Sequence, residues 1–185
     1  MNQITDSQFE ILHNTTYDSL YTIAFSYVLN KFDAEDIVQD VFIKLYRARK
    51  EFSDEQSLKY WLIRVTINKC IDFLRLKKYT VRLFDNDEYI NNLPDTSNLV
   101  SSSNNKNEEI RKCVLSLKES YKTVIILRYY DNYSIKEMAS ILKISETNVN
   151  VRLNRAKTKL KKMIEERRKK NGGWRIKRII KNRNS

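Results

Sequence analysis

Apolar residues recur with the period of an α-helix along the first third of the chain. One stripe lies between residues 17 and 28, a second between 37 and 45, and a third between 58 and 74. Asp33, with Asp36 three residues on, is expected to cap the second helix, and the polar run 53–57 precedes the third. Amphipathic helices with such short connections bury their stripes against one another. Residues 6–79 are therefore predicted to form a compact three-helix bundle.

Helical patterning returns at residues 108–170, with helices expected to begin near Glu108 and Glu119. Ser134–Lys162 then predicts two short helices joined by a tight turn, with Ser134 and Ser145 placed to cap them. This arrangement is typical of a helix-turn-helix, whose second helix enters the DNA major groove. Lys143 occupies a turn position that often needs a positive φ, at a cost on the order of 1 kcal/mol for a non-glycine residue.

The second of these helices is expected to present a polar face suited to DNA. Asparagine can pair with adenine edges, and valine can touch a thymine methyl group. The predicted outward residues are Thr147, Asn148, Asn150, Val151 and Asn154. Phosphate charge would come from Arg152, Arg155, Lys157, Lys159, Lys161 and Lys162. A plain solvated basic face is the alternative, but cap, turn and charge coincide in one stretch, which favours DNA.

Two segments lack the helical period. Residues 80–107 are rich in Asn, Asp and Ser, contain the single proline, Pro94, and predict a flexible linker. Residues 171–185 form a basic tail, and Gly172–Gly173 are expected to end the preceding helix. The tail fits three interpretations: a solvated tail, a clamp on the DNA backbone, or an amphipathic segment for a membrane surface or partner.

Composition supports an all-α fold with two small helical domains. The 185 residues include only 2 Gly and 1 Pro, and 41% are hydrophobic. The net charge of +12 is uneven. Residues 1–80 carry 11 basic and 11 acidic side chains, whereas residues 107–185 carry 22 and 8. A neutral module followed by a strongly basic one indicates a polyanion as the second module's partner.

Other classes of protein find little support. No apolar run reaches the ~18 residues that span a bilayer, and the first residues lack a signal-peptide pattern, which predicts a cytoplasmic protein. Cys70 and Cys113 are expected to be buried thiols, not a disulfide or metal pair. The single histidine, His13, has no catalytic constellation, and no phosphate loop is present. We expect no enzyme, no cofactor, no metal and no small-molecule substrate.

The first module has two unlike faces. The start of its second helix is acidic, and helix-dipole complementarity explains Asp33 and Glu35 but says little about Gln39 and Asp40. The third helix combines basic residues with aromatic ones at its start. Such a mixture can stack an unpaired base while holding its backbone, although a solvated face would carry the same charges.

The sequence here resembles a known family. DAEDIVQDVFIKLYRARKEF followed by SLKYWLIRVTINKCIDFLRLKK looks like region 2 of the bacterial extracytoplasmic-function (ECF) sigma factors. The helix-turn-helix at 134–162, ending RAKTKLKK, is similar to their region 4. The first segment is highly specific, whereas the second alone is shared with many regulators. Together they cover most of the chain, in the family's order.

The resemblance implies an alternative sigma factor that recruits core RNA polymerase to promoters. The acidic residues that match the family's contact with the β′ clamp are Asp33, Glu35, Asp36, Gln39 and Asp40. The residues that match minus-10 recognition, which captures a flipped base, are Tyr60, Trp61, Arg64, Asn68, Asp72 and Arg75, after the loop 52–57. Those that match minus-35 duplex recognition are Thr147, Asn148, Asn150, Val151, Arg152, Asn154, Arg155 and Lys157.

The resemblance also implies partners and location. Beyond the β′ and β subunits of polymerase and promoter DNA, an anti-sigma factor is expected, because ECF members are commonly held inactive by one. The protein would join the nucleoid within the holoenzyme, or be held at the membrane by that factor. Two alternatives stay open: a stand-alone helix-turn-helix regulator, which would bind palindromes as a dimer, and an adaptor with a membrane-binding tail.

Overall fold

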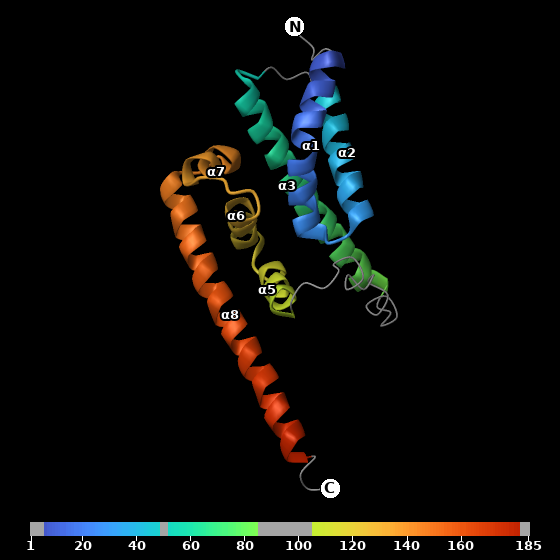
Figure 1. The fold of residues 1–185 in the computed structure, drawn as a ribbon. Coiled ribbons are helices and arrows are strands. Elements are labelled where there is room, and N and C mark those ends of the chain that lie inside the picture. Colours follow the sequence, from blue (N-terminus) through green and yellow to red (C-terminus); the bar gives the residue numbers. More distant parts are fainter. Residues whose placement is uncertain (1–5, 49–51, 85–104, 182–185) are drawn as a thin grey trace.

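The chain folds into helices that form two modules. The computed structural model describes residues 6–48, 52–84 and 105–181, with side chains for 9–48, 52–77 and 110–169. The first module comprises α1 (Asp6–Val28), α2 (Lys31–Arg47) and α3 (Glu55–Phe84). The second comprises α5 (Asn105–Leu115), α6 (Glu119–Tyr129), α7 (Ile135–Leu142) and α8 (Glu146–Lys181). Figure 1 shows α6 and α7 between the first module and the long α8. The all-α prediction is confirmed for the described residues.

The connection between α1 and α2 is a tight turn with two local causes. Leu29 adopts a left-handed conformation, with φ 56°, and so ends α1. The side-chain oxygen of Asn30 then accepts a hydrogen bond from the backbone N–H of Asp33, at 3.1 Å. The cap of α2 is therefore Asn30, and the prediction that Asp33 caps this helix is wrong. Asp33 lies in the first turn, where its charge complements the helix dipole.

The three-helix bundle predicted for the first module is present. Its core is made of residues with almost no exposed surface, among them Ile23, Val38, Val41 and Leu62. At the start of α3, Asp54 accepts a hydrogen bond from the backbone N–H of Ser57, at 2.6 Å. That cap gives α3 a fixed beginning after the polar run.

Two predicted boundaries differ from the structure. Helix α3 continues to Phe84 and α5 begins at Asn105, so helix enters both ends of the expected linker, and residues 85–104 lie outside the described residues. Helix α8 continues through Gly172–Gly173 to Lys181, so the prediction that these glycines end it is wrong. Each glycine costs about 1 kcal/mol in a helix interior, which weakens a long helix without terminating it.

The second module buries its apolar residues between α8 and the helices beside it, including Val114, Ile126, Leu127 and Leu153. Cys70 and Cys113 are both buried and free, as the sequence predicts. The buried apolar residues of the two modules form one continuous cluster. The modules therefore pack against each other as well as internally.

Candidate nucleic-acid and partner interfaces

The helix-turn-helix geometry begins with a capping box on α7. The backbone N–H of Glu137 donates to the Ser134 hydroxyl at 3.3 Å, and the Glu137 carboxylate accepts from the Ser134 backbone N–H at 2.8 Å. The Glu137 carboxylate also accepts from the Ser134 hydroxyl at 2.7 Å, and this hydrogen bond, followed by the one from the Ser134 backbone N–H, lowers the pKa of Glu137. Both members of the box satisfy donors that a helix start leaves without partners. The predicted Ser134 cap is confirmed.

The turn that follows holds the two helices close. Lys143 has φ 54°, the left-handed conformation the sequence predicts there, and Ser145 accepts from the backbone N–H of Asn148 at 3.2 Å. Ala139 and Val149 are both buried where α7 packs against α8. Cap, turn and packing together fix the direction of α8.

The first three turns of α8 present the predicted polar face. Every residue of the predicted minus-35 set is exposed except Arg152, which is half-buried. The Arg152 guanidinium donates to the side-chain oxygen of Asn148 at 2.9 Å, so it orients that amide. Among the described residues, Asn150 has no side-chain hydrogen-bond partner. Val151, 41% exposed, places an apolar surface beside it.

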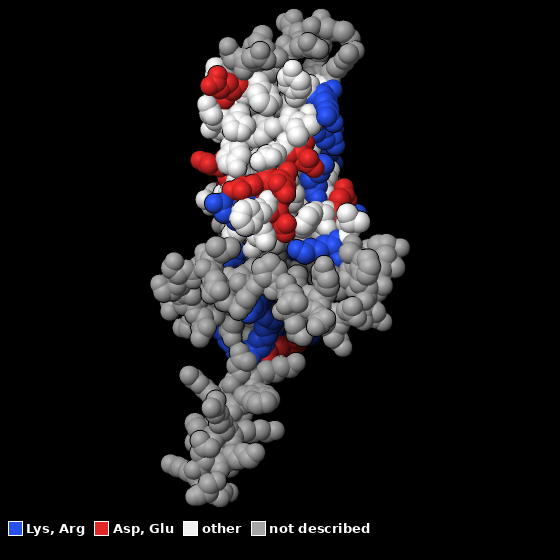
Figure 2. Space-filling view, turned by 90° about the vertical axis from the view of Figure 1, so that its right-hand side faces the viewer, with Lys and Arg blue, Asp and Glu red and all other residues white. Residues whose placement is uncertain are grey.

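The acidic face of α2 belongs to the first module. Figure 2 shows acidic side chains gathered across the face on which α2 lies. Three of the predicted residues form ion pairs: Asp33 with Lys77 (3.4 Å), Glu35 with Lys31 (3.8 Å) and Asp40 with Lys69 (2.7 Å). Asp36 and Gln39 are exposed between them. The five residues form one contiguous surface along a single helix.

The predicted minus-10 residues all lie on α3 but divide into two groups. Asn68 and Asp72 are exposed, and Trp61 is half-buried, with its ring edge-on to Phe52 at 5.5 Å. Tyr60, Arg64 and Arg75 instead face the second module. Burial raises the pKa of Tyr60 and lowers that of Arg64.

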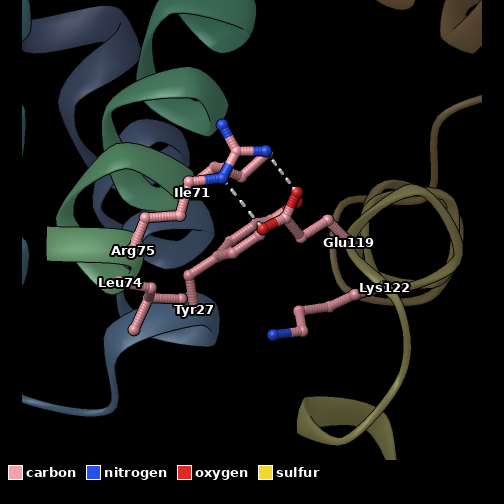
Figure 3. A pocket seen from close by; sticks show the side chains of 6 residues that line it. All are labelled: Tyr27, Ile71, Leu74, Arg75, Glu119 and Lys122. Atoms are coloured by element: carbon pink, nitrogen blue, oxygen red, sulfur yellow. Dashed lines mark hydrogen bonds and ion pairs between the residues drawn. The ribbon is translucent and has the colours of Figure 1, made fainter. Parts of the chain in front are cut away.

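Arg64 and Arg75 bind groups of the second module directly. The Arg64 guanidinium donates to the backbone carbonyls of Ile141 and, at 3.1 Å, Ser140, both at the end of α7. Arg75 donates twice to the Glu119 carboxylate on α6, at 2.7 and 3.2 Å. Figure 3 shows this pair crossing the gap between α3 and α6, where Lys122 points into the same space.

The space in Figure 3 is a cavity of about 120 Å³ between the modules. Lys122 is only 7% exposed, its ammonium lies 5.9 Å from the centre of the Tyr27 ring, and burial lowers its pKa. Glu119, Lys122 and Thr123 were not predicted as functional residues. Their sequence positions follow an ordinary helical pattern, and contact with a distant helix leaves no local signal.

Other kinds of site find no support in the described part of the chain. His13 packs within an aromatic group, 4.7 Å from the Phe42 ring and 5.2 Å from the Tyr17 ring, measured between ring centres. No three His, Cys, Asp or Glu side chains gather as a metal site would require among the described residues. No helix there combines the length and apolar character needed to cross a membrane.

Comparison with known proteins agrees with this geometry. The model of sigma-70 region 2 matches residues 12–79, and that of sigma-70 region 4 matches residues 107–160. RNA polymerase sigma factor SigV of Bacillus subtilis is 33% identical over 136 residues, which cover 74% of this chain and 78% of SigV. ECF RNA polymerase sigma factor SigX of the same organism is 30% identical over 168 residues, covering 86% and 85%.

Solved structures show the same fold. The sigma factor RpoE of Bartonella quintana, solved with the anti-sigma factor NepR, has a TM-score of 0.63 at 21% identity, covering 85% of this chain and 96% of that one. CnrH, solved with the cytosolic domain of CnrY, has a TM-score of 0.61 at 22% identity, covering 88% and 90%. Two matching region models in the expected order and two relatives that align over most of their length confirm the resemblance. The chain belongs to the extracytoplasmic-function sigma factors, the initiation factors of bacterial RNA polymerase.

Proposed function

We propose that this sigma factor joins core RNA polymerase through the acidic face of α2 and directs it to promoters with α8 and α3. The observation that carries the proposal is the separation of an exposed acidic helix, α2, and an exposed recognition helix, α8, capped by Ser145, onto different modules. A stand-alone regulator would need only the second. The chain is a cytoplasmic initiation factor without catalytic activity, associated with the nucleoid within the holoenzyme.

The polymerase contact centres on Asp36 and Gln39. Both are exposed, and the flanking carboxylates are held in place by ion pairs with Lys31, Lys69 and Lys77. Exposed ion pairs contribute little stability, with a typical value of ~0–1 kcal/mol each. A basic partner can therefore displace those lysines at small cost, which suits a docking surface.

Promoter recognition divides between the two modules. Helix α8 reads the minus-35 duplex with Asn150 and Val151 at its centre, because an unpaired amide and a valine methyl match the edges of adenine and thymine. Phosphate charge comes from the exposed Arg155 and Lys157. Helix α3 and the loop 52–57 bind the melted minus-10 strand, where Tyr60 and the arginines supply stacking and charge.

An anti-sigma factor is the proposed regulator. Two solved structures with this fold are complexes with a second protein: RpoE of Bartonella quintana is bound to the anti-sigma factor NepR, and CnrH to the cytosolic domain of CnrY. In this chain such a partner would compete for the acidic face of α2. Membrane attachment of the partner would hold the complex at the membrane.

Transcription by purified core polymerase, with and without this protein, on a pool of the host's promoter fragments tests the proposal. We expect discrete start sites that depend on the protein. If polymerase neither binds the protein nor starts at any new site, the regulator alternative replaces the sigma assignment.

A paired substitution tests the docking surface. Asp36→Arg with Gln39→Ala should abolish polymerase binding while circular dichroism stays unchanged. Glu10→Arg with Asn14→Ala makes the same changes at exposed positions of α1 and should bind normally. Retained binding by the α2 variant would refute the assignment of this face.

A further inference from the structure

Asn148 lies in the first turn of α8, where a recognition helix meets the bases. The Ser145 hydroxyl accepts a hydrogen bond from the Asn148 backbone N–H at 3.2 Å, so the helix cap fixes the backbone at this residue. The side chain of Asn148 is exposed. Base contacts of a helix-turn-helix come from the N-terminal residues of its second helix. The Asn148 amide is therefore placed to reach a base edge in the major groove.

The oxygen of that amide already has a partner. The Arg152 Nε–H donates to the Asn148 Oδ1 atom at 2.9 Å, about one helical turn along α8. A guanidinium has donors and no acceptor, so only the oxygen of the amide can face it. Turning the amide over would set N–H groups against the Arg152 donors and lose a charge-assisted hydrogen bond. Arg152 has further N–H donors for a phosphate, so binding DNA does not require this bond to break.

The free end of the Asn148 amide is its NH₂ group. The oxygen keeps a second lone pair, but a base amino group that used it would point its hydrogens toward the neighbouring guanidinium. A keto oxygen instead accepts from the NH₂ group and is attracted by the positive charge beside it. Guanine O6 and thymine O4 are such oxygens, whereas adenine N6 and cytosine N4 carry amino hydrogens in the major groove. Hydrogen bonding and charge therefore favour the same two bases.

Asn150 differs from Asn148 in this respect. Within the described part of the chain its amide has no side-chain partner, so its oxygen and its NH₂ group are both free. An amide that is free at both ends pairs with adenine N6 and N7 together. At about 100° of rotation per residue, the two asparagines lie about 200° apart around α8, on opposite edges of its exposed face. They are placed to contact different positions of the duplex.

We infer that Arg152 is a positioning residue that restricts Asn148 to a base with a keto group, guanine or thymine, in the minus-35 duplex. This inference rests on the proposed function, because it uses the assignment of α8 to that duplex. It adds the chemical class of base that one side chain selects. Asn148 makes the base contact, and Arg152 acts through Asn148.

Base pairs differ in the strand that carries the keto oxygen. Each pair holds one keto base and one amino base, so its orientation decides which strand offers the acceptor. G·C and T·A present the keto oxygen on one strand, whereas C·G and A·T present it on the other. An amide held by Arg152 should therefore prefer one of these two groups to the other. An amide that pairs with adenine through both of its polar atoms would instead single out one base pair of the four.

Competition binding to promoter fragments measures this preference. The protein is bound to core RNA polymerase, and the fragments carry every base pair in turn at each position of a minus-35 element found in the transcription experiment. Asn148→Ala identifies the base pair that Asn148 contacts, as the position where the preference disappears. At that position we expect the unmodified protein to bind the two favoured base pairs about tenfold more tightly than the other two.

Arg152→Met releases the amide and keeps an unbranched side chain on α8. The released amide can turn over and accept from an amino group, so the difference between the two groups should fall from about tenfold to about twofold or less. The preference at the base pair of Asn150, located in the same way with Asn150→Ala, should not change. Lys157→Met removes an exposed cation from the same helix, and should weaken binding of all fragments equally without changing their order.

A second variant covers the case in which Arg152→Met does not fold. The carboxylate of Asn148→Asp has acceptors only, so one oxygen keeps the bond to Arg152 and the other accepts from an amino group. The added negative charge should weaken binding to every fragment, and the two groups of base pairs should exchange their order. Asn154→Asp adds the same charge at another exposed position of α8, and should weaken binding without changing the order at the base pair of Asn148.

Three results would overturn the inference. Equal losses at every base pair in Asn148→Ala would show that the amide contacts a phosphate oxygen and not a base. A preference for one adenine-containing base pair alone would show that Arg152 does not restrict the amide to a keto base. An order that Arg152→Met and Asn148→Asp both leave unchanged would show that Arg152 has no part in it. Failure of the proposed function is seen separately, as the lack of any protein-dependent start site in the transcription experiment, and the inference would fall with it.

Discussion

Asp131 carries a half-buried carboxylate whose effect on the free energy of unfolding can be measured. It lies in the connection between α6 and α7, and its Oδ2 atom has no hydrogen-bond partner among the described residues. Burial raises its pKa from the ordinary 3.8 to about 6, with Lys59 of α3 acting in the opposite direction. Tyr133 lies in the same connection, and its pKa is raised by burial and also by the nearby Asp131, Glu137 and Tyr60. We predict that Asp131→Asn stabilises the protein at pH 7.5.

The sign follows from proton linkage. The folded protein holds the proton of Asp131 more tightly than the unfolded chain does, so protonation of Asp131 stabilises the folded state. This stabilisation is complete below pH 3.8, declines as the pH rises, and is lost above about pH 6. A shift of about two pKa units corresponds to at most ~3 kcal/mol. A buried amide without partners has its own cost, so we expect a gain of roughly 1–2 kcal/mol.

Urea unfolding of both proteins at pH 7.5 and pH 4.0 measures the effect. The advantage of Asp131→Asn should be present at the higher pH and nearly absent at the lower one. Asp36→Asn removes an exposed carboxylate of α2 and should change stability by less than about 0.5 kcal/mol at either pH. An unstable Asp131→Asn variant, or an advantage that does not depend on pH, would refute the reasoning.

The remaining predictions concern the helix-turn-helix. Asn150→Ala should weaken minus-35 duplex binding by ~1–3 kcal/mol if the amide makes a bidentate base contact; unchanged affinity in a titration would move readout to its neighbours. Arg155→Ala should lower the slope of log K against log salt by ~0.9 if it contacts a phosphate, and an unchanged slope would exclude that contact. Lys143→Gly should raise stability by roughly 0.5–1 kcal/mol in urea unfolding, since its φ is 54°. Lys136→Gly, within α7, should instead lower it by ~1 kcal/mol, and equal effects of the two glycines would contradict the turn argument.

Local signals in the sequence predicted the local structure well. The Ser134 cap, the Ser145 cap and the positive φ of Lys143 each depend on residues within one or two turns of helix. Errors occurred where two local signals competed. Asn30 and Asp33 are both good caps, and the left-handed Leu29 that selects Asn30 has no side-chain signature. Paired glycines predict a helix end, but α8 continues through them.

The sequence predicted which helix faces make up the candidate site, but it did not predict the side-chain contacts between the modules. Charge and period placed the acidic residues on one face of α2 and the asparagines on one face of α8. Nothing in the sequence indicates that Arg64 meets Ser140, 76 positions later, or that Arg75 meets Glu119. Such contacts depend on how two modules pack, which no single helix encodes.

The hydrogen bond between Tyr27 and Thr123 limits how freely these modules can be exchanged between relatives. A chimera that joined residues 6–84 to the second module of another sigma factor would place a new side chain opposite the buried Tyr27 hydroxyl. Where that side chain lacked an acceptor, the hybrid would lose about 1–3 kcal/mol of coupling between its halves. Regulation that depends on that coupling would be inherited with the pair of modules, and preference for the minus-35 element with the second module alone.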